Sequence, residues 1–218
     1  MLFHRLFVLL FPSRCVLCRK LLLCAETDFC HRCRTQAPEF GKTKSRFSFL
    51  AGWTAVWYYK EDVRKSLKRY KFYGRRSYAP AFGRMLAAKL QQESLTDFDI
   101  LTWVPISPLR YLTRGYDQSA LLAEATAKAL GITARKTLRK IRNTPPQSGI
   151  SDVYRRRANV LGAYRPIEPE TLRGKRILLL DDIITTGATA SECARTLLTA
   201  GTREVTFAAM AATQFETK

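Results

Sequence analysis

The stretch ILLLDDIITTGAT at residues 177–189 carries the residue types best suited to hold a phosphorylated sugar. Four aliphatic residues lead into two adjacent acids, Asp181 and Asp182, and a small, hydroxyl-rich turn follows. Small residues in front of a helix allow backbone N–H groups and the helix N-terminus to face a phosphate. Carboxylates accept hydrogen bonds from vicinal hydroxyls. We therefore expect the acids to bind ribose hydroxyls and the turn to bind the 5-phosphate, through Thr185, Thr186, Gly187, Ala188 and Thr189.

A plainer interpretation of the same stretch is a helix N-cap in a charged surface turn. The turn is not a Walker loop, because the sequence G-x4-G-K-[ST] is absent from it. Two carboxylates beside such a turn suit a ribose 5-phosphate.

Five of the six cysteines lie in the first 33 residues, and four of them form two Cys-x2-Cys pairs. Two such pairs supply four thiolates to a tetrahedral zinc ion, with no open position for water, so the predicted zinc site is structural. A disulfide cluster and a redox Cys-x2-Cys motif are the alternatives. Cys24 and His31 are spare ligands. The predicted ligands are Cys15, Cys18, Cys30 and Cys33.

Residues 60–76 combine eight Lys and Arg residues with interleaved aromatic residues. Basic groups follow a phosphate backbone, and aromatic rings stack on unpaired bases. The alternative is a basic amphipathic helix whose aromatic residues belong to the core, as expected for Tyr70 on the apolar stripe. The predicted contacts to single-stranded nucleic acid are Lys68, Arg69, Lys71, Phe72, Tyr73, Arg75 and Arg76.

The composition agrees with a polyanionic partner and a folded chain. The 218 residues include 37 Lys and Arg against 18 Asp and Glu, a formal net charge of +19, and 46% of them are hydrophobic. The apolar run from Leu6 to Phe11 is too short to span a membrane, so we expect a short helix there and a cytoplasmic protein. Peripheral contact with the inner face of the membrane is the alternative.

Strand-like and helix-like segments alternate after residue 50, which predicts a mostly parallel sheet. In such folds ligands bind where the strands end and the helices begin. Residues 142–157 hold a Pro-Pro pair and are expected to form a loop. The expected strands are 52–59, 99–104, 176–180 and 204–210, and the expected helices are 61–73, 80–92, 117–130 and 188–199.

The stretch at 177–189 resembles the phosphoribosyl-pyrophosphate (PRPP) signature of type I phosphoribosyltransferases. Nearly the whole chain resembles one branch of them, the ComF (ComFC) competence proteins and the related gluconate-cluster DNA-utilisation protein. The paired cysteines match, as do LKRYKFYGRR, VPISPLRYLTRGYDQS, RNTPPQSGIS and RRRANVLGAY. Cys24 departs from the pattern, because it leaves one cysteine more than four ligands require.

The resemblance implies a type I phosphoribosyltransferase-like parallel sheet flanked by helices. It divides the chain into an N-terminal helix, zinc knuckle and linker at 1–50 and the phosphoribosyltransferase-like domain at 51–218. It places the pyrophosphate loop at 105–108, with Ser107, Arg110 and Arg114 as phosphate contacts. It also makes 142–157 a lid with Arg142 and Gln147 as contacts. Mg²⁺ would neutralise the pyrophosphate of PRPP.

The resemblance further implies a role in natural transformation, in which single-stranded DNA enters the cytoplasm and DNA-uptake or processing proteins are partners. We expect a ComF-type protein that binds PRPP and this DNA. The alternatives are a phosphoribosyltransferase acting on a base or small acceptor, and a PRPP-sensing regulator without turnover. No residue is identified as a general base, so the sequence supports PRPP binding better than turnover.

Overall fold

A computed structural model describes residues 12–23, 25–41, 47–144 and 158–214. Its centre is a four-stranded sheet in the order β1-β6-β5-β2, and every neighbouring pair is parallel. The strands are β1 (Gly52–Tyr58), β2 (Ile100–Trp103), β5 (Arg176–Ile184) and β6 (Glu204–Ala212). The predicted parallel α/β fold is therefore confirmed. The expected N-terminal helix, Cys24 and Gln147 lie outside the described residues.

The central strands are hydrophobic because helices cover both faces of the sheet. Along β5, Leu178 and Leu180 pack into one hydrophobic core and Ile177 and Leu179 into the other. Successive residues of a strand point to opposite faces, which explains this alternation. The first core lies under α3 (Glu61–Phe72), α4 (Ala79–Gln92) and α6 (Gln118–Leu130), and the second under α8 (Ala188–Thr199).

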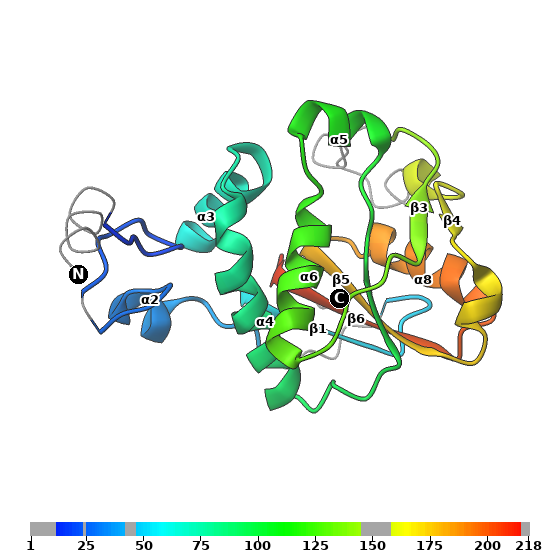
Figure 1. The fold of residues 1–218 in the computed structure, drawn as a ribbon, viewed down its shortest axis with the longest axis horizontal. Coiled ribbons are helices and arrows are strands. Elements are labelled where there is room, and N and C mark those ends of the chain that lie inside the picture. Colours follow the sequence, from blue (N-terminus) through cyan, green and yellow to red (C-terminus); the bar gives the residue numbers. More distant parts are fainter. Residues whose placement is uncertain (1–11, 24, 42–46, 145–157, 215–218) are drawn as a thin grey trace.

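A small antiparallel pair of strands stands beside α8 (Figure 1). It consists of β3 (Leu138–Lys140) and β4 (Tyr164–Pro166), in which Lys140 pairs with Tyr164. The remaining short elements are α2 (His31–Gln36), α5 (Pro108–Arg114) and two 3-10 turns at Arg76–Tyr78 and Pro169–Leu172. None of these short elements was expected from the sequence, because three to seven residues carry too little periodicity to be recognised.

The largest difference from the expected boundaries concerns β5. The expected strand ended at residue 180, whereas β5 continues to Ile184 and includes both acids. Its hydrogen bonding with β6 continues as far as the pair of Ile184 with Ala212. The two carboxylates thus project from a paired strand, whose backbone is more rigid than a turn.

The cysteine-containing segment, residues 12–36, packs on α3 and α4 and shares their hydrophobic core (Figure 1). Ser66 Oγ donates a buried hydrogen bond of 2.6 Å to the carbonyl of Val16. Arg69 Nη2 donates to the carbonyls of Val16 and Leu17, at 3.3 and 2.5 Å. Arg84 on α4 forms a bidentate ion pair with Asp28. The position of α3 therefore depends on this segment.

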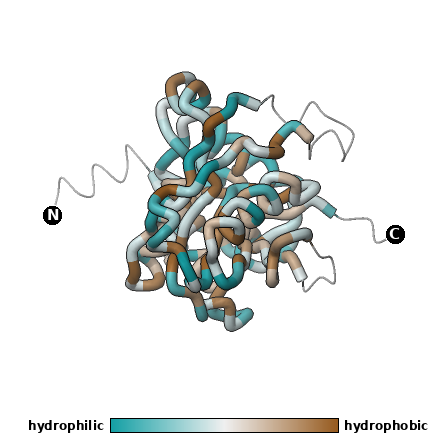
Figure 2. The backbone as a smooth tube through the Cα atoms, turned by 90° about the vertical axis from the view of Figure 1, so that its right-hand side faces the viewer, coloured by the Kyte–Doolittle hydropathy of each residue, from teal (hydrophilic) through white to brown (hydrophobic). Residues whose placement is uncertain are grey.

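Short hydrophobic and hydrophilic segments alternate along the backbone, as Figure 2 shows. This alternation is expected when helices and strands bury one face and expose the other. Within the described parts of the chain, no helix has the length and hydrophobicity needed to cross a membrane.

Candidate ligand-binding cavity

A cavity of about 630 Å³ opens at the carboxyl edge of the parallel sheet. Its floor contains Asp181 and Asp182, and its walls come from α3, the segment after β2, α5, and the β3–β4 pair. Six cationic side chains line it: Arg64, Lys68, Lys71, Arg110, Arg114 and Lys140. Two acids on the floor and six cations on the walls suit a ligand with several phosphates and free hydroxyls.

The two acids differ in their surroundings. Asp182 is buried and forms an ion pair of 2.8 Å with Lys71 Nζ, which comes from α3. Asp181 accepts hydrogen bonds from Ser119 Oγ at 2.7 Å and from the backbone N–H of Asp182 at 2.8 Å. Burial, and next the charge of Asp182, raise the pKa of Asp181 to about 8. At neutral pH, Asp181 and Asp182 together therefore carry less than their full charge of −2.

The turn after the acids adjoins a smaller hollow of about 40 Å³, lined by Thr185, Gly187, Ala188 and Thr189. The hydroxyl oxygen of Thr186 is buried and has no hydrogen-bond partner among the described residues. Gly187 has a φ of 70° and precedes the first turn of α8, and a Cβ there would clash with the ring of Phe47. A buried hydroxyl without a hydrogen-bond partner is rare in proteins. At a helix N-terminus, a bound anion would supply the missing partner.

The segment after β2 contributes unequally to the cavity. Arg110 and Arg114 line it, whereas the side chain of Ser107 does not. Ser107 is the N-cap of α5, and its Oγ accepts from the backbone N–H of Arg110 at 3.4 Å. Arg114 donates to Gln118 Oε1 and lies 5.2 Å from the ring centre of Phe72. The two arginines are thus held at the cavity, and the hydroxyl of Ser107 serves the helix.

The basic segment that we assigned to DNA divides into three groups. Lys68, Lys71 and Phe72 line the cavity. Arg69 faces the cysteine segment, and Arg76 donates to the carbonyl of Gly115 and lies 4.6 Å from the ring centre of Tyr116. Tyr73 and Arg75 are exposed outside it. Part of this segment therefore lies in the same cavity as the two acids.

The structure adds site residues that the sequence analysis did not propose. Arg64 lies one and two helical turns before Lys68 and Lys71, a spacing that puts all three on one face of α3 and was visible in the sequence. Lys140 and Tyr164 enter from the β3–β4 pair, whose strands are too short to show a pattern in the sequence. Arg142 follows this pair, and its Nη2 donates to the carbonyl of Asn159 at 3.3 Å.

The four predicted cysteine ligands meet in one cluster at the other side of α3. The sulfurs of Cys15, Cys18, Cys30 and Cys33 all lie within 4.8 Å of one another, and those of Cys18 and Cys30 are 3.6 Å apart. Sulfurs around a tetrahedral zinc ion, with Zn–S bonds of about 2.3 Å, lie about 3.8 Å apart. The cluster therefore fits a metal ion such as zinc.

The chain is similar to curated competence and DNA utilization proteins. It is 25% identical to competence protein F of Haemophilus influenzae over 218 residues, which cover 89% of this chain and 95% of that protein. It is 28% identical to the DNA utilization protein YhgH of Salmonella typhimurium over 217 residues, covering 89% of this chain and 94% of that protein. It is 30% identical to competence protein ComFC of Streptococcus pneumoniae over 153 residues, covering 69% of this chain and 64% of that protein. No family model matches the sequence.

Among solved structures, the chain is similar to an allosteric regulatory enzyme of purine biosynthesis, with a TM-score of 0.44 and 26% identity over 65% of this chain. The glutamine PRPP amidotransferase from B. subtilis gives the same TM-score, identity and coverage of this chain. The present chain spans about 30% of the length of each of these proteins.

Proposed function

We propose that this chain, a homologue of competence proteins F and ComFC and of the DNA utilization protein YhgH, is a ComF-type protein that binds a phosphoribosyl ligand of the PRPP type and single-stranded DNA during natural transformation. One observation carries the proposal. A single cavity unites the acid pair of β5, the hydroxyl-rich turn before α8 and six cations from distant parts of the chain. The fold that supports them is of the type I phosphoribosyltransferase kind.

Each part of a PRPP molecule has a complementary group in this cavity. The ribose hydroxyls donate to Asp181 and Asp182, displacing Lys71 from Asp182. The 5-phosphate occupies the turn at residues 185–189, where Thr186 Oγ1 has no described partner. The pyrophosphate lies toward Arg110 and Arg114, with Mg²⁺ supplying further neutralisation of its charge. Arg142 and Gln147 belong to the segment that would complete the site.

Single-stranded DNA would follow the outer part of the basic segment. Phe72 and Tyr73 are 62% and 71% exposed, so their rings are accessible for stacking on bases. Arg75 lies beside them and is also exposed. Since Phe72 also lines the cavity, a DNA strand bound there would pass its mouth.

We assign zinc to the cysteine cluster as a structural ion, in an N-terminal part that extends to residue 50. Four thiolates leave no position for a reacting water. The domain from residue 51 onward carries every cavity-lining residue.

The experiment that tests the proposal is PRPP binding by a double variant, Asp181→Asn with Asp182→Asn. It replaces both carboxyl groups by amides of nearly the same volume, so the wild-type circular dichroism spectrum should be kept while PRPP affinity falls at least tenfold. Glu170→Gln, at an exposed acid outside the cavity, is the matched control. Unchanged PRPP binding by the double variant would refute the assignment.

Turnover is tested separately, by measuring pyrophosphate release from PRPP with candidate bases and small acceptors. Release that depends on an acceptor would make the protein a phosphoribosyltransferase. Binding without release, together with a PRPP-dependent change in DNA affinity, would make it a PRPP-sensing regulator.

A further inference from the structure

Lys140 is the most unusual cation of the cavity. It lines the cavity although only 8% of it is exposed to solvent. Its Nζ lies 5.2 Å from the ring centre of Tyr164, the residue with which it pairs across β3 and β4. Among the described residues, no carboxylate lies within ion-pair distance of it. Buried lysines are rare without a partner, because the charged amine loses its hydration.

Groups from five parts of the fold surround this amine. They are Arg110 on α5, Arg142 after β3, Tyr164 on β4, Asp181 on β5 and Cys193 on α8. Burial first, and the charge of Arg110 second, lower the pKa of Lys140 to about 8, against the smaller opposing effects of Cys193 and Asp181. The free protein therefore holds a lysine that is partly neutral near physiological pH.

The neighbouring cation is fixed in place. Arg110 Nη2 donates to the carbonyl of Thr144 at 2.8 Å, and Ser107 caps the helix that carries Arg110. Two neighbouring cations repel each other in an empty cavity. An anion that binds between them attracts both and relieves this repulsion. The burial of Lys140 and its position near Arg110 are therefore what we expect of an anion-binding site that holds no ligand.

We propose that Lys140 binds the pyrophosphate group of the ligand together with Arg110, and that it takes up a proton when this group binds. The inference rests on the proposed function for the orientation of the ligand, in which the 5-phosphate lies in the turn before α8. It adds a binding residue, and a dependence of affinity on pH, to that site. The amine accepts the proton from solvent, and its charge then meets the phosphate oxygens directly.

The sign of the pH dependence follows from the lowered pKa. Well below pH 8 the amine is already charged and binding needs no proton from solvent. Above that value binding must first protonate it, so affinity falls up to tenfold for each further pH unit. An arginine at this position stays charged throughout and removes this dependence.

Isothermal titration with inorganic pyrophosphate tests the inference with Lys140→Met, Lys140→Arg and the control Lys136→Met. Lys136 is exposed, lies four residues earlier and does not line the cavity. We expect Lys140→Met to weaken pyrophosphate binding about tenfold to a hundredfold, as for a lost charge-assisted hydrogen bond. Ribose 5-phosphate binding should change less than twofold, because its phosphate lies in the turn.

Isothermal titrations at pH 8 in two buffers of different ionisation enthalpy measure how many protons are taken up when pyrophosphate binds. The wild type should take up roughly half a proton more than Lys140→Arg, since the ligand's own protons contribute equally to both. Equal uptake by the two proteins, or equal pyrophosphate affinity of Lys140→Met and Lys136→Met, would overturn the inference. So would an equal loss of ribose 5-phosphate and pyrophosphate binding.

These outcomes are distinct from failure of the proposed function. PRPP binding that survives loss of both acids contradicts the ribose assignment and leaves the pyrophosphate titrations to decide on Lys140. A wild-type protein that binds neither PRPP nor pyrophosphate contradicts both proposals.

Discussion

Asp181 and Asp182 are identical in type and adjacent in sequence, yet their environments give them different properties. Asp182 has a lysine within 2.8 Å, whereas the nearest donors to Asp181 are a hydroxyl and a backbone N–H. A full positive charge stabilises a carboxylate more than neutral donors do. The environment of Asp182 is therefore set by Lys71, a residue that lies far away along the chain.

The raised pKa of Asp181 predicts how its removal changes stability with pH. A carboxyl whose pKa rises from an ordinary value near 4 to about 8 on folding opposes folding increasingly as pH rises through this window. We expect Asp181→Asn to be more stable than the wild type at pH 8, by about 2–4 °C in Tm, and the difference to shrink toward pH 4. Thermal unfolding at both pH values measures it. A stability difference that does not vary with pH would contradict the assignment.

The ion pair of Lys71 and Asp182 gives a second prediction at this scale. Lys71→Met leaves a buried carboxylate without its cation, which should lower the free energy of unfolding by on the order of 1–3 kcal/mol. Adding Asp182→Asn to that variant should restore most of the loss, because no charge is then left unpaired. Urea unfolding of the two single variants and the double variant measures the coupling. Strictly additive effects would show that the pair contributes nothing.

The two acids and the small, hydroxyl-rich turn could be recognised from the sequence, because a hydrophobic run ending in carboxylates and small residues is a local pattern. The sequence could not supply Lys71 as the partner of Asp182, since 111 positions separate them. Lys140 was missed for a related reason. It owes its place to a strand of three residues, β3, that pairs only with β4.

At the scale of elements, the close crossing of α4 and α6 depends on one glycine. A Cβ at Gly83 would lie 2.5 Å from the backbone carbon of Ala125, in a region where neither helix can shift without moving the core. We expect Gly83→Ala to destabilise the protein by about 1–3 kcal/mol despite its better helix propensity. Gly52→Ala, where a Cβ meets nothing within 4 Å, is the control in the same unfolding assay. Equal stability of the two variants would contradict this packing.

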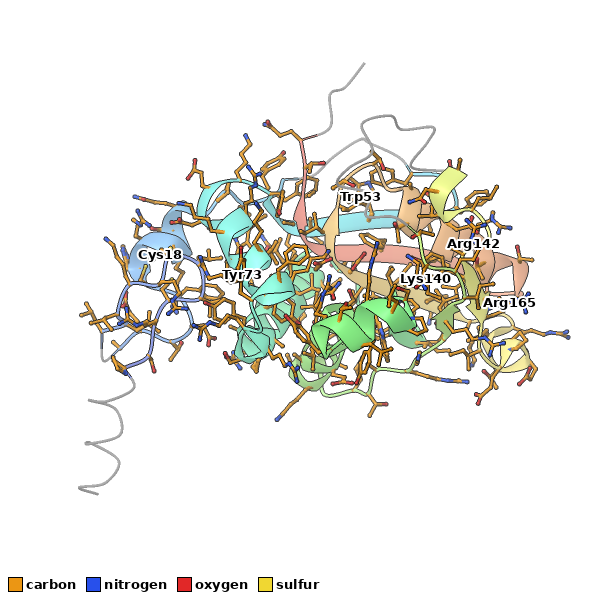
Figure 3. The ribbon with its side chains drawn as sticks, turned by 90° about the horizontal axis from the view of Figure 1, so that it is seen from above. Cys18, Trp53, Tyr73, Lys140, Arg142 and Arg165 are labelled. Atoms are coloured by element: carbon orange, nitrogen blue, oxygen red, sulfur yellow. The ribbon has the colours of Figure 1, made fainter. Side chains whose placement is uncertain are left out.

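The cysteine segment and the cavity lie on opposite sides of α3, so this helix couples them. Figure 3 places Cys18 away from Lys140 and Arg142, with Tyr73 between. Ser66 and Arg69 hold the carbonyls of the cysteine turn, and Lys68 and Lys71 of the same helix line the cavity. The cysteine segment thereby holds α3 in place on the side of this helix that faces away from the cavity.

Removal of the metal should therefore weaken ligand binding at a distance. We expect chelation, or Cys33→Ser, to lower both the Tm and the affinity for pyrophosphate, and Cys24→Ser to retain one zinc per chain. Metal analysis and titration of the same samples measure both quantities. Full pyrophosphate affinity in metal-free, folded protein would contradict the coupling.

At the scale of the whole molecule, the basic residues behind the net charge of +19 lie both inside and outside the cavity. Lys68 lines the cavity, and Arg75, seven residues later, is exposed outside it. The sequence alone gave both residues the same role, because composition does not report which direction a side chain faces. Only the packing of α3 against α4 and α6 separates them.

This separation predicts different binding defects. Lys68→Ala should weaken the binding of both pyrophosphate and single-stranded DNA, whereas Arg75→Ala should weaken only the binding of DNA. Each should reduce the slope of log affinity for DNA against log salt concentration by up to about 1. Titrations between 50 and about 200 mM salt measure it. Loss of pyrophosphate binding in Arg75→Ala would contradict the division.

The strand order has a consequence for synthesis of the chain. β6 is the last of the described strands, yet it lies between β1 and β5 and is hydrogen-bonded to both. While residues 204–212 are still inside the ribosome, β1 has no neighbour in the sheet and β5 has an open edge. Non-local pairing of this kind slows folding and exposes hydrophobic edges. The sheet is therefore completed only after nearly all of this sequence has been translated, and the nascent chain needs protection from aggregation until then.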